Sequence, residues 1–234
     1  PEKYATFWTQ FGAVLKEGPS EDNGNREKIA KLFRFASSTS GSAEQNVSLT
    51  DYVERMKEGQ DKIYFVTGDS HSVIKNSPYL EVFDKHGIEV LLMSDRIDEW
   101  MMGYLTEFDG KSFQDVARGE LDLSKITGEE PKSESNADDE KSEDKENAEL
   151  LVRIKSLLED KVEEVRSTSR LTNSPACLVV GANDMGEQMR KIMAAAGQAV
   201  PEAKPILEIN AEHPLVNKLD TEADEDRAKV LAGV

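Results

Sequence analysis

Asp69, Ser70 and His71 are consecutive and are the residue types of a hydrolytic triad. Neighbours in sequence seldom point at one another, however, and no nucleophile elbow surrounds the serine. We therefore expect Asp69 or Ser70 to cap a helix. The histidines His71, His86 and His213 lack the spacing of metal ligands, and no glycine-rich phosphate loop occurs. The sequence thus predicts no catalytic residue, no metal site and no bound cofactor in this chain.

A second kind of chemistry, the binding of other proteins, is indicated by apolar side chains. Trp100, Met101 and Met102 are consecutive, and a helix buries only one stripe, so the three cannot all face one core. Trp100 lies near the edge of the stripe and Met102 outside it, whereas the acids Asp98 and Glu99 fall on the polar side. Tryptophan is enriched at binding hot spots and methionine adapts to varied partners. These residues either form a contact site or complete the hydrophobic cover of their domain.

A similar stripe occurs later in the chain, where Met185, Met189, Ile192 and Met193 recur at helical spacing. As part of a core such a stripe is ordinary. As an exposed face it would be a flexible surface that accepts many ligands. The sequence leaves both interpretations open, and the core is the more usual one.

The elements that position these residues begin with three helices, expected at residues 2–17, 27–36 and 48–57. Ser48 with Asp51 resembles a capping box at the start of the third helix. In the first helix, six apolar residues repeat at helical spacing and are expected to face a core: Tyr4, Phe7, Trp8, Phe11, Val14 and Leu15.

A layered α/β unit follows these helices. A strand at 61–68 and a buried apolar strand at 88–93 are joined by a helical segment at 70–86. A crossover of this length predicts parallel pairing with a right-handed connection. The next helix carries an apolar stripe made of Ile97, Trp100, Met101, Tyr104 and Leu105. Residues 107–116 are expected to form a short strand or turn.

An acidic segment at 128–148 divides the chain. Between residues 129 and 146 it contains nine acids and three lysines and no large apolar side chain. Such a segment buries too little surface to offset the entropy of ordering, so we expect a flexible linker. An acidic tail that binds a partner is the alternative.

The second half is predicted to be a mixed α/β domain. Its expected elements are helices at 149–164, at 213–219 and at 222–234, strands at 164–169, 176–180 and 205–209, and a helix capped by Asn183 and Asp184 that carries the methionine stripe. The fold class is therefore α/β (α+β). A helical coil at 1–58 leads into a small three-layer α/β/α unit at 59–127, and the mixed domain occupies 149–234.

Composition narrows the function. The 234 residues carry 46 acids against 29 lysines and arginines, a net charge of −17, which argues against a nucleic-acid partner. No signal peptide or membrane-spanning run occurs, so no membrane is expected. The single cysteine, Cys177, cannot form an internal disulfide and is expected to be an inert residue of an apolar strand in a cytoplasmic protein. Pro1 is not an initiator residue and suggests a piece of a longer protein.

Three runs of sequence resemble the ninety-kilodalton heat-shock chaperones: IYFVTGDS at 63–70, SPYLEVF…GIEVLLMSDRIDEWMMGYLTEFDGK within 77–111, and RLTNSPACLV at 170–179. The bacterial form of the family is the most similar. The resemblance covers most of the chain and is weakest from 128 to 147. It implies that residues 1–127 are the end of the middle domain and that 149–234 are most of the C-terminal domain.

The resemblance implies an ATP-dependent chaperone that binds partly folded client proteins, with co-chaperones as further partners. It places the ATP and magnesium site in an N-terminal domain before Pro1, and the helices of the homodimer after Val234. Dimerisation of this chain is therefore expected to be weak or absent. The client contacts implied by the family fall on this chain at Trp100, Gly103, Met185, Met189, Ile192 and Met193, and the apolar pattern adds Met102.

Two other functions stay open at this point. A scaffold or adaptor would position partner domains without binding unfolded protein. A stand-alone hydrolase is the weakest of the three, because no set of residues in the sequence supports catalysis.

Overall fold

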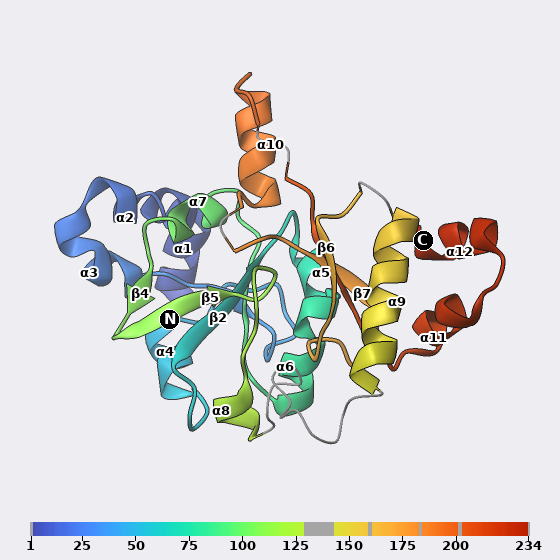
Figure 1. The fold of residues 1–234 in the computed structure, drawn as a ribbon. Helices are drawn as coiled ribbons and strands as arrows, with labels where there is room; N and C mark the ends of the chain where they lie inside the picture. Colours follow the sequence, from blue (N-terminus) through green and yellow to red (C-terminus); the bar gives the residue numbers. More distant parts are fainter. Residues whose placement is uncertain (1, 129–142, 159–160, 183, 201–202, 234) are drawn as a thin grey trace. The chain divides into compact units, whose positions relative to one another are not determined.

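The computed structural model describes residues 2–128, 143–158, 161–182, 184–200 and 203–233, which form two compact units (Figure 1). Unit 1 comprises residues 1–117 together with 185–200, and unit 2 comprises 118–184 together with 201–234. The acidic linker predicted at 128–148 falls mostly on residues 129–142, which lie outside the described residues.

Unit 1 is built on a five-stranded sheet with the strand order β1-β3-β2-β5-β4. β2 (Lys62–Thr67) pairs in parallel with β3 (Leu91–Met93) and with β5 (Lys111–Asp115). β1 (Ala36–Ser37) and β4 (Glu107–Phe108) close the two edges in antiparallel fashion. The parallel pairing predicted from the length of the crossover is therefore confirmed.

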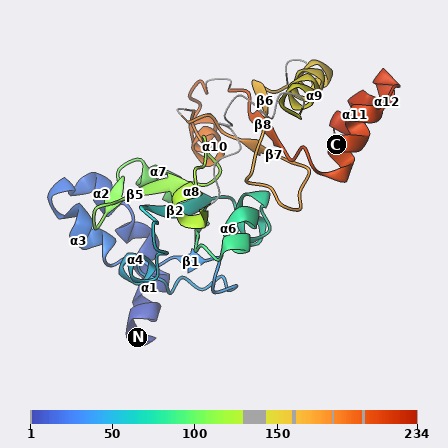
Figure 2. The same ribbon diagram turned by 60° about the horizontal axis from the view of Figure 1, so that its bottom comes forward.

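Helical segments cover both faces of this sheet (Figures 1 and 2). The helical segments of unit 1 are α1 (Glu2–Leu15), α2 (Gly18–Glu21), η1 (Asn23–Asn25), α3 (Arg26–Ala30), α4 (Leu49–Glu54), α5 (His71–Lys75), η2 (Pro78–Leu80), α6 (Glu81–His86), α7 (Asp98–Met102) and α10 (Glu187–Ala195). Of these, α10 projects away from the sheet (Figure 1). Phe65 of β2 lies in one core cluster with Trp8 and Leu49. The next residue along the strand, Tyr64, meets Phe83 of α6, with 4.9 Å between ring centroids. Because alternate strand residues point to opposite faces, the predicted three-layer arrangement is confirmed.

Local signals account for several element ends in unit 1. Ser48 and Asp51 form the predicted capping box at the start of α4. Ser70 caps α5 by accepting a hydrogen bond from the backbone N–H of Val73, as expected for that position. Gly87 ends α6 in the left-handed conformation, with φ of 61°, which glycine adopts without a steric penalty.

The second predicted helix, 27–36, is wrong beyond Ala30. After α3 the chain becomes extended, Phe35 bridges to Val47, and β1 pairs with β3. Phe33 and Phe35 are both fully buried. The core thus accepts these aromatic rings from an extended segment, and that tertiary demand overrides the helical spacing of the apolar residues.

The aromatic face predicted for α1 is only partly a core face. Trp8 is buried, whereas Phe7, Phe11 and Val14 are exposed. The helix packs on the core of unit 1 through the buried Trp8 and Gly12 and through the half-buried Tyr4 and Leu15. Gly12 allows the indole to lie close to the helix, because a Cβ at this position would stand only 2.8 Å from ring atoms of Trp8.

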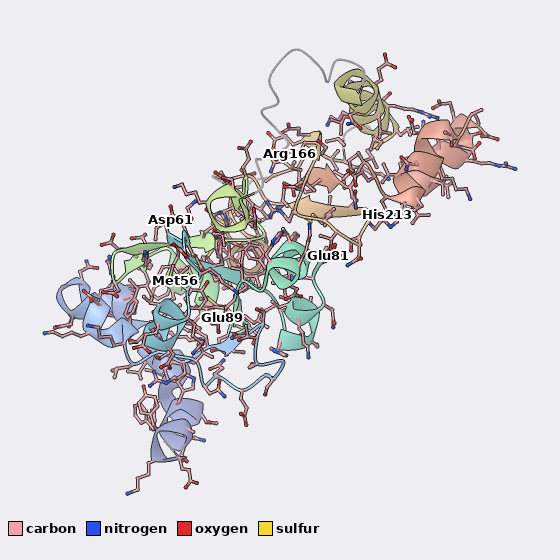
Figure 3. All side chains as sticks on the ribbon, turned by 90° about the horizontal axis from the view of Figure 1, so that it is seen from below. Met56, Asp61, Glu81, Glu89, Arg166 and His213 are labelled. Carbon is pink, nitrogen blue, oxygen red and sulfur yellow. The ribbon has the colours of Figure 1, made fainter. Side chains whose placement is uncertain are left out.

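Unit 2 contains a three-stranded sheet of order β6-β8-β7. Its elements are α8 (Ser124–Thr127), α9 (Glu143–Leu158), β6 (Glu164–Ser167), β7 (Ala176–Val179), β8 (Ile206–Ile209), α11 (Pro214–Thr221) and α12 (Glu225–Ala232). The three predicted strands are confirmed, and α9 begins before its expected start at residue 149. The buried carboxylate of Glu208, in β8, pairs with Arg166 (2.7 Å), which is labelled in Figure 3, and with Arg170 (2.9 Å).

Candidate functional site

A buried cluster of charged and polar side chains fixes α7 to the core of unit 1. Lys16, directly after α1, and Asp98 of α7 are both 0% exposed, and their charged atoms lie 2.6 Å apart. Lys16 also pairs with Asp95 at 2.7 Å. Gln45 accepts a hydrogen bond from the indole N–H of Trp8 (2.7 Å) and donates one to Asp95 (3.0 Å). The sequence pattern put Asp98 on the polar side of its helix, and that placement is wrong because Lys16 neutralises the carboxylate within the core.

The surroundings shift the pKa values of the two aspartates of this cluster in opposite directions. Burial raises the pKa of Asp98, and the nearby charge of Lys16 offsets this only in part. Burial also opposes ionisation of Asp95, but the charge and hydrogen bond of Lys16 outweigh it, so the pKa of Asp95 is lowered. The difference follows from exposure, because the Asp95 side chain keeps 31% of its surface in solvent.

The residues that follow Asp98 divide between core and surface. Met101 is fully buried, and Met102 is half-buried against the same core cluster. Trp100 is half-buried and packs on Tyr104, with 4.9 Å between ring centroids, and Tyr104 itself is 39% exposed. Gly103, which ends α7, is exposed. Tyr104 is thus a surface residue, although the apolar stripe of residues 97–105 predicted it to face the core. Its spacing of four residues from Trp100 does predict their contact.

The methionine stripe lies on α10. Met185, Met189 and Met193 are half-buried, and Ile192 is 37% exposed, so the stripe is neither a sealed core face nor fully in solvent. The helix starts at Glu187 after an N-cap at Gly186, which supplies no side-chain hydrogen bond. The predicted caps do not serve α10, since Asp184 lies before its N-cap and Asn183 lies outside the described residues.

Both groups of predicted contact residues belong to unit 1, although about 90 residues separate them in the chain. The Glu99 carboxylate of α7 accepts a hydrogen bond from the backbone N–H of Met189, at 2.9 Å. Lys191 of α10 pairs with Asp69, after β2, at 2.7 Å. Figure 1 shows α10 with its first turn next to α7. The sequence placed Glu99 only on the polar side of its helix and did not single out Lys191, because the partners of both residues are distant in the chain.

A comparison with protein families identifies the family of this chain. The family described as Hsp90 protein matches residues 1–232. The chain belongs to the Hsp90 family. The resemblance seen in the three sequence runs is thereby confirmed at the level of the family, and membership gives this Hsp90-family chain the role of a chaperone.

Two of the three histidines and the single cysteine of this Hsp90-family chain lie at positions within or next to regular secondary structure. His213 caps α11 by accepting a hydrogen bond from the backbone N–H of Leu215, at 3.2 Å, and His86 is the last residue of α6. Cys177 is buried in β7. Among the residues that the structure describes, no three His, Cys, Asp or Glu side chains gather into a possible metal site. Over the same described ranges, no helix combines the length and apolar character needed to cross a bilayer.

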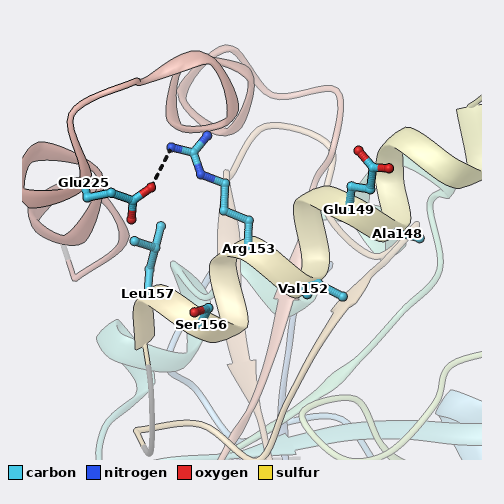
Figure 4. A pocket seen from close by; sticks show the side chains of 7 residues that line it. All are labelled: Ala148, Glu149, Val152, Arg153, Ser156, Leu157 and Glu225. Carbon is cyan, nitrogen blue, oxygen red and sulfur yellow. Dashed lines mark ion pairs between the residues drawn. The ribbon is translucent and has the colours of Figure 1, made fainter.

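A pocket of about 440 Å³ lies in unit 2 on the outer side of α9 (Figure 4). Its lining residues are Ala148, Glu149, Val152, Arg153, Ser156, Leu157 and Glu225. Arg153 and Glu225 approach to 3.8 Å across it. Besides this ion pair the lining holds the polar side chains of Glu149 and Ser156 and three apolar side chains, which are too few convergent polar groups to define a small-molecule site.

Proposed function

We propose that this Hsp90-family chain binds partly folded client proteins on one surface of unit 1. We call it the α7–α10 surface. Its members are Trp100, Met102, Gly103, Tyr104, Met185, Met189, Ile192 and Met193. The observation that carries the proposal is the pairing of α7 with α10, which brings an indole and several thioether side chains onto the same unit.

The chemistry of this surface supports such a role. Trp100 and Tyr104 form a rigid aromatic pair, and methionine side chains adjust to differently shaped apolar segments. Partial burial leaves apolar area for a client while the same residues keep contact with their own unit. The net charge of −17 disfavours self-association of the apolar surface between copies of the chain.

Finer assignments rest on the sequence resemblance alone. They are a bacterial member of the family, a cytoplasmic location, ATP and magnesium bound by a domain outside these residues, a homodimer in the parent protein, and co-chaperones as additional partners. The client contacts at Trp100, Gly103, Met185, Met189, Ile192 and Met193 have the same basis, and the geometry of unit 1 adds Tyr104 to them.

Suppression of aggregation of a heat-unfolded model enzyme tests the proposal. The triple variant Trp100→Ala, Met189→Ala, Met193→Ala should lose most of the protection that the wild-type chain gives. Its thermal midpoint should stay nearly unchanged, because all three side chains are only partly buried.

A matched control removes apolar surface elsewhere, through Val73→Ala, Val152→Ala and Val230→Ala, three exposed valines outside the α7–α10 surface. This variant should protect the model enzyme as the wild type does. Equal protection by both triple variants would contradict the proposed surface. Absence of protection by the wild type would favour a scaffold that binds no unfolded protein.

A further inference from the structure

The N-cap residue of α10 makes no side-chain hydrogen bond. A helix begins with backbone N–H groups that have no partner within the helix, and an N-cap side chain usually accepts from one of them. The N-cap here is Gly186, which has no side chain to do so. The acceptor comes instead from α7, where Glu99 Oε2 lies 2.9 Å from the Met189 nitrogen.

This contact is favoured by electrostatics as well as by hydrogen bonding. The N-terminal end of a helix carries a partial positive charge, so a carboxylate stabilises it more than a neutral acceptor would. The effect is strongest within the first turn, which is where Met189 lies. Glu99 is half-buried, so solvent screens the contact less than it would at an exposed site.

The residue before Glu99 holds α7 itself in place. Asp98 is fully buried on Lys16, while Glu99 turns to α10. Adjacent acids thus join one short helix to the core on one side and to a distant helix on the other. The second link of α10, between Lys191 and Asp69, is an exposed pair of the kind that changes an equilibrium by about fivefold at most.

We propose that Glu99 is a positioning residue that holds α10 beside α7, so that Trp100 and the methionines of α10 bind one client segment together. The proposal rests on the proposed function, since it explains how two helices distant in sequence act as a single surface. Without Glu99, the backbone N–H of Met189 would lose its carboxylate acceptor, whereas the exposed pair between Lys191 and Asp69 would remain.

The test measures amide hydrogen exchange in α10 together with client protection, in the full chain. Glu99→Ala should speed exchange of the α10 amides by about fivefold, as loss of a helix cap does, and should weaken protection of the unfolded enzyme. Glu99→Gln keeps an oxygen acceptor without the charge, and it should restore part of both effects. Glu54→Ala, which removes an exposed acid from α4, is the control and should change neither.

Unchanged α10 exchange in Glu99→Ala would overturn the proposal. So would equal loss of protection in the Ala and Gln variants with normal exchange, because this pattern means direct charge contact with the client. Faster exchange with full protection would also overturn it. Failure of the proposed function has a different signature, namely full protection by the Trp100, Met189 and Met193 triple variant. Should Glu99→Ala lower the thermal midpoint, Glu99→Gln and the α10 exchange rates still decide the matter.

Discussion

The helices α7 and α10 carry the candidate contact residues of the same surface, yet they are held in different ways. α7 has only five residues and is fixed by a buried ion pair and by Met101 in the core. α10 has nine residues, an exposed Ile192 and polar links through Glu99 and Lys191. The aromatic pair thus lies on a firmly anchored helix, and the methionines lie on a helix with weaker polar links. This combination suits a surface that must accept clients of varied shape.

Among tests of this difference, the substitution Asp98→Ala should have the largest effect on the free energy of unfolding. It leaves the ammonium of Lys16 buried with Asp95 as its remaining ionic partner, and breaking a buried pair in this way costs about 3–5 kcal/mol of unfolding free energy. Urea denaturation measures the loss. The double change Lys16→Met with Asp98→Leu should be less harmful, because it removes both fully buried charges and leaves only the partly exposed Asp95 without its cation. A loss below about 1 kcal/mol in Asp98→Ala would show that α7 is not anchored by this pair.

A pair of truncations compares the apolar contacts of the two helices. Met101→Ala removes a fully buried side chain and should cost about 2–5 kcal/mol. Ile192→Ala removes one that is 37% exposed and should change the unfolding free energy by about 0.5 kcal/mol. Both values come from the same denaturation experiment. Equal losses in the two variants would mean that α10 is part of the core and that the comparison fails.

The smallest expected effect is the pH dependence of stability that comes from the ion pairs of Lys16 with Asp95 and Asp98. A lowered pKa means that Asp95 stabilises the fold above its unfolded pKa of about 4, and that this contribution is lost as the pH falls through the lower folded value. Asp98 has the opposite sign, because its raised pKa makes its ionisation oppose folding as the pH rises.

The corresponding measurement is the difference in urea midpoint between the wild type and Asp95→Asn at several pH values. That difference should be largest near neutral pH and should shrink below a pH of about 4. The comparison of two chains cancels the titration of carboxylates that do not interact with Asp95. A difference that stays constant from neutral pH to pH of about 3 would exclude ionised Asp95 from the anchor.

Local patterns were sufficient for most elements of unit 1. The apolar runs at 61–68 and 88–93 predicted two strands, and glycine at position 87 marked the end of α6. These features depend on neighbours within a few residues, whose steric and hydrogen-bonding demands are the same in any fold. The helix expected at 31–36 was not formed because the core took Phe33 and Phe35 from an extended chain.

The sequence by itself determined the family, through three runs of residues that resemble it. It also determined the α/β class and the types of residue available for contact, since these depend on short-range patterns. Tertiary structure alone decided which of them meet. The apolar stripe predicts that α10 buries one side but not which unit that side contacts. The sequence likewise does not show that the Glu99 carboxylate accepts a hydrogen bond from an N–H group about 90 residues away. Such contacts arise only when the whole chain closes its core, because the energy of each is small beside the packing that brings the helices together.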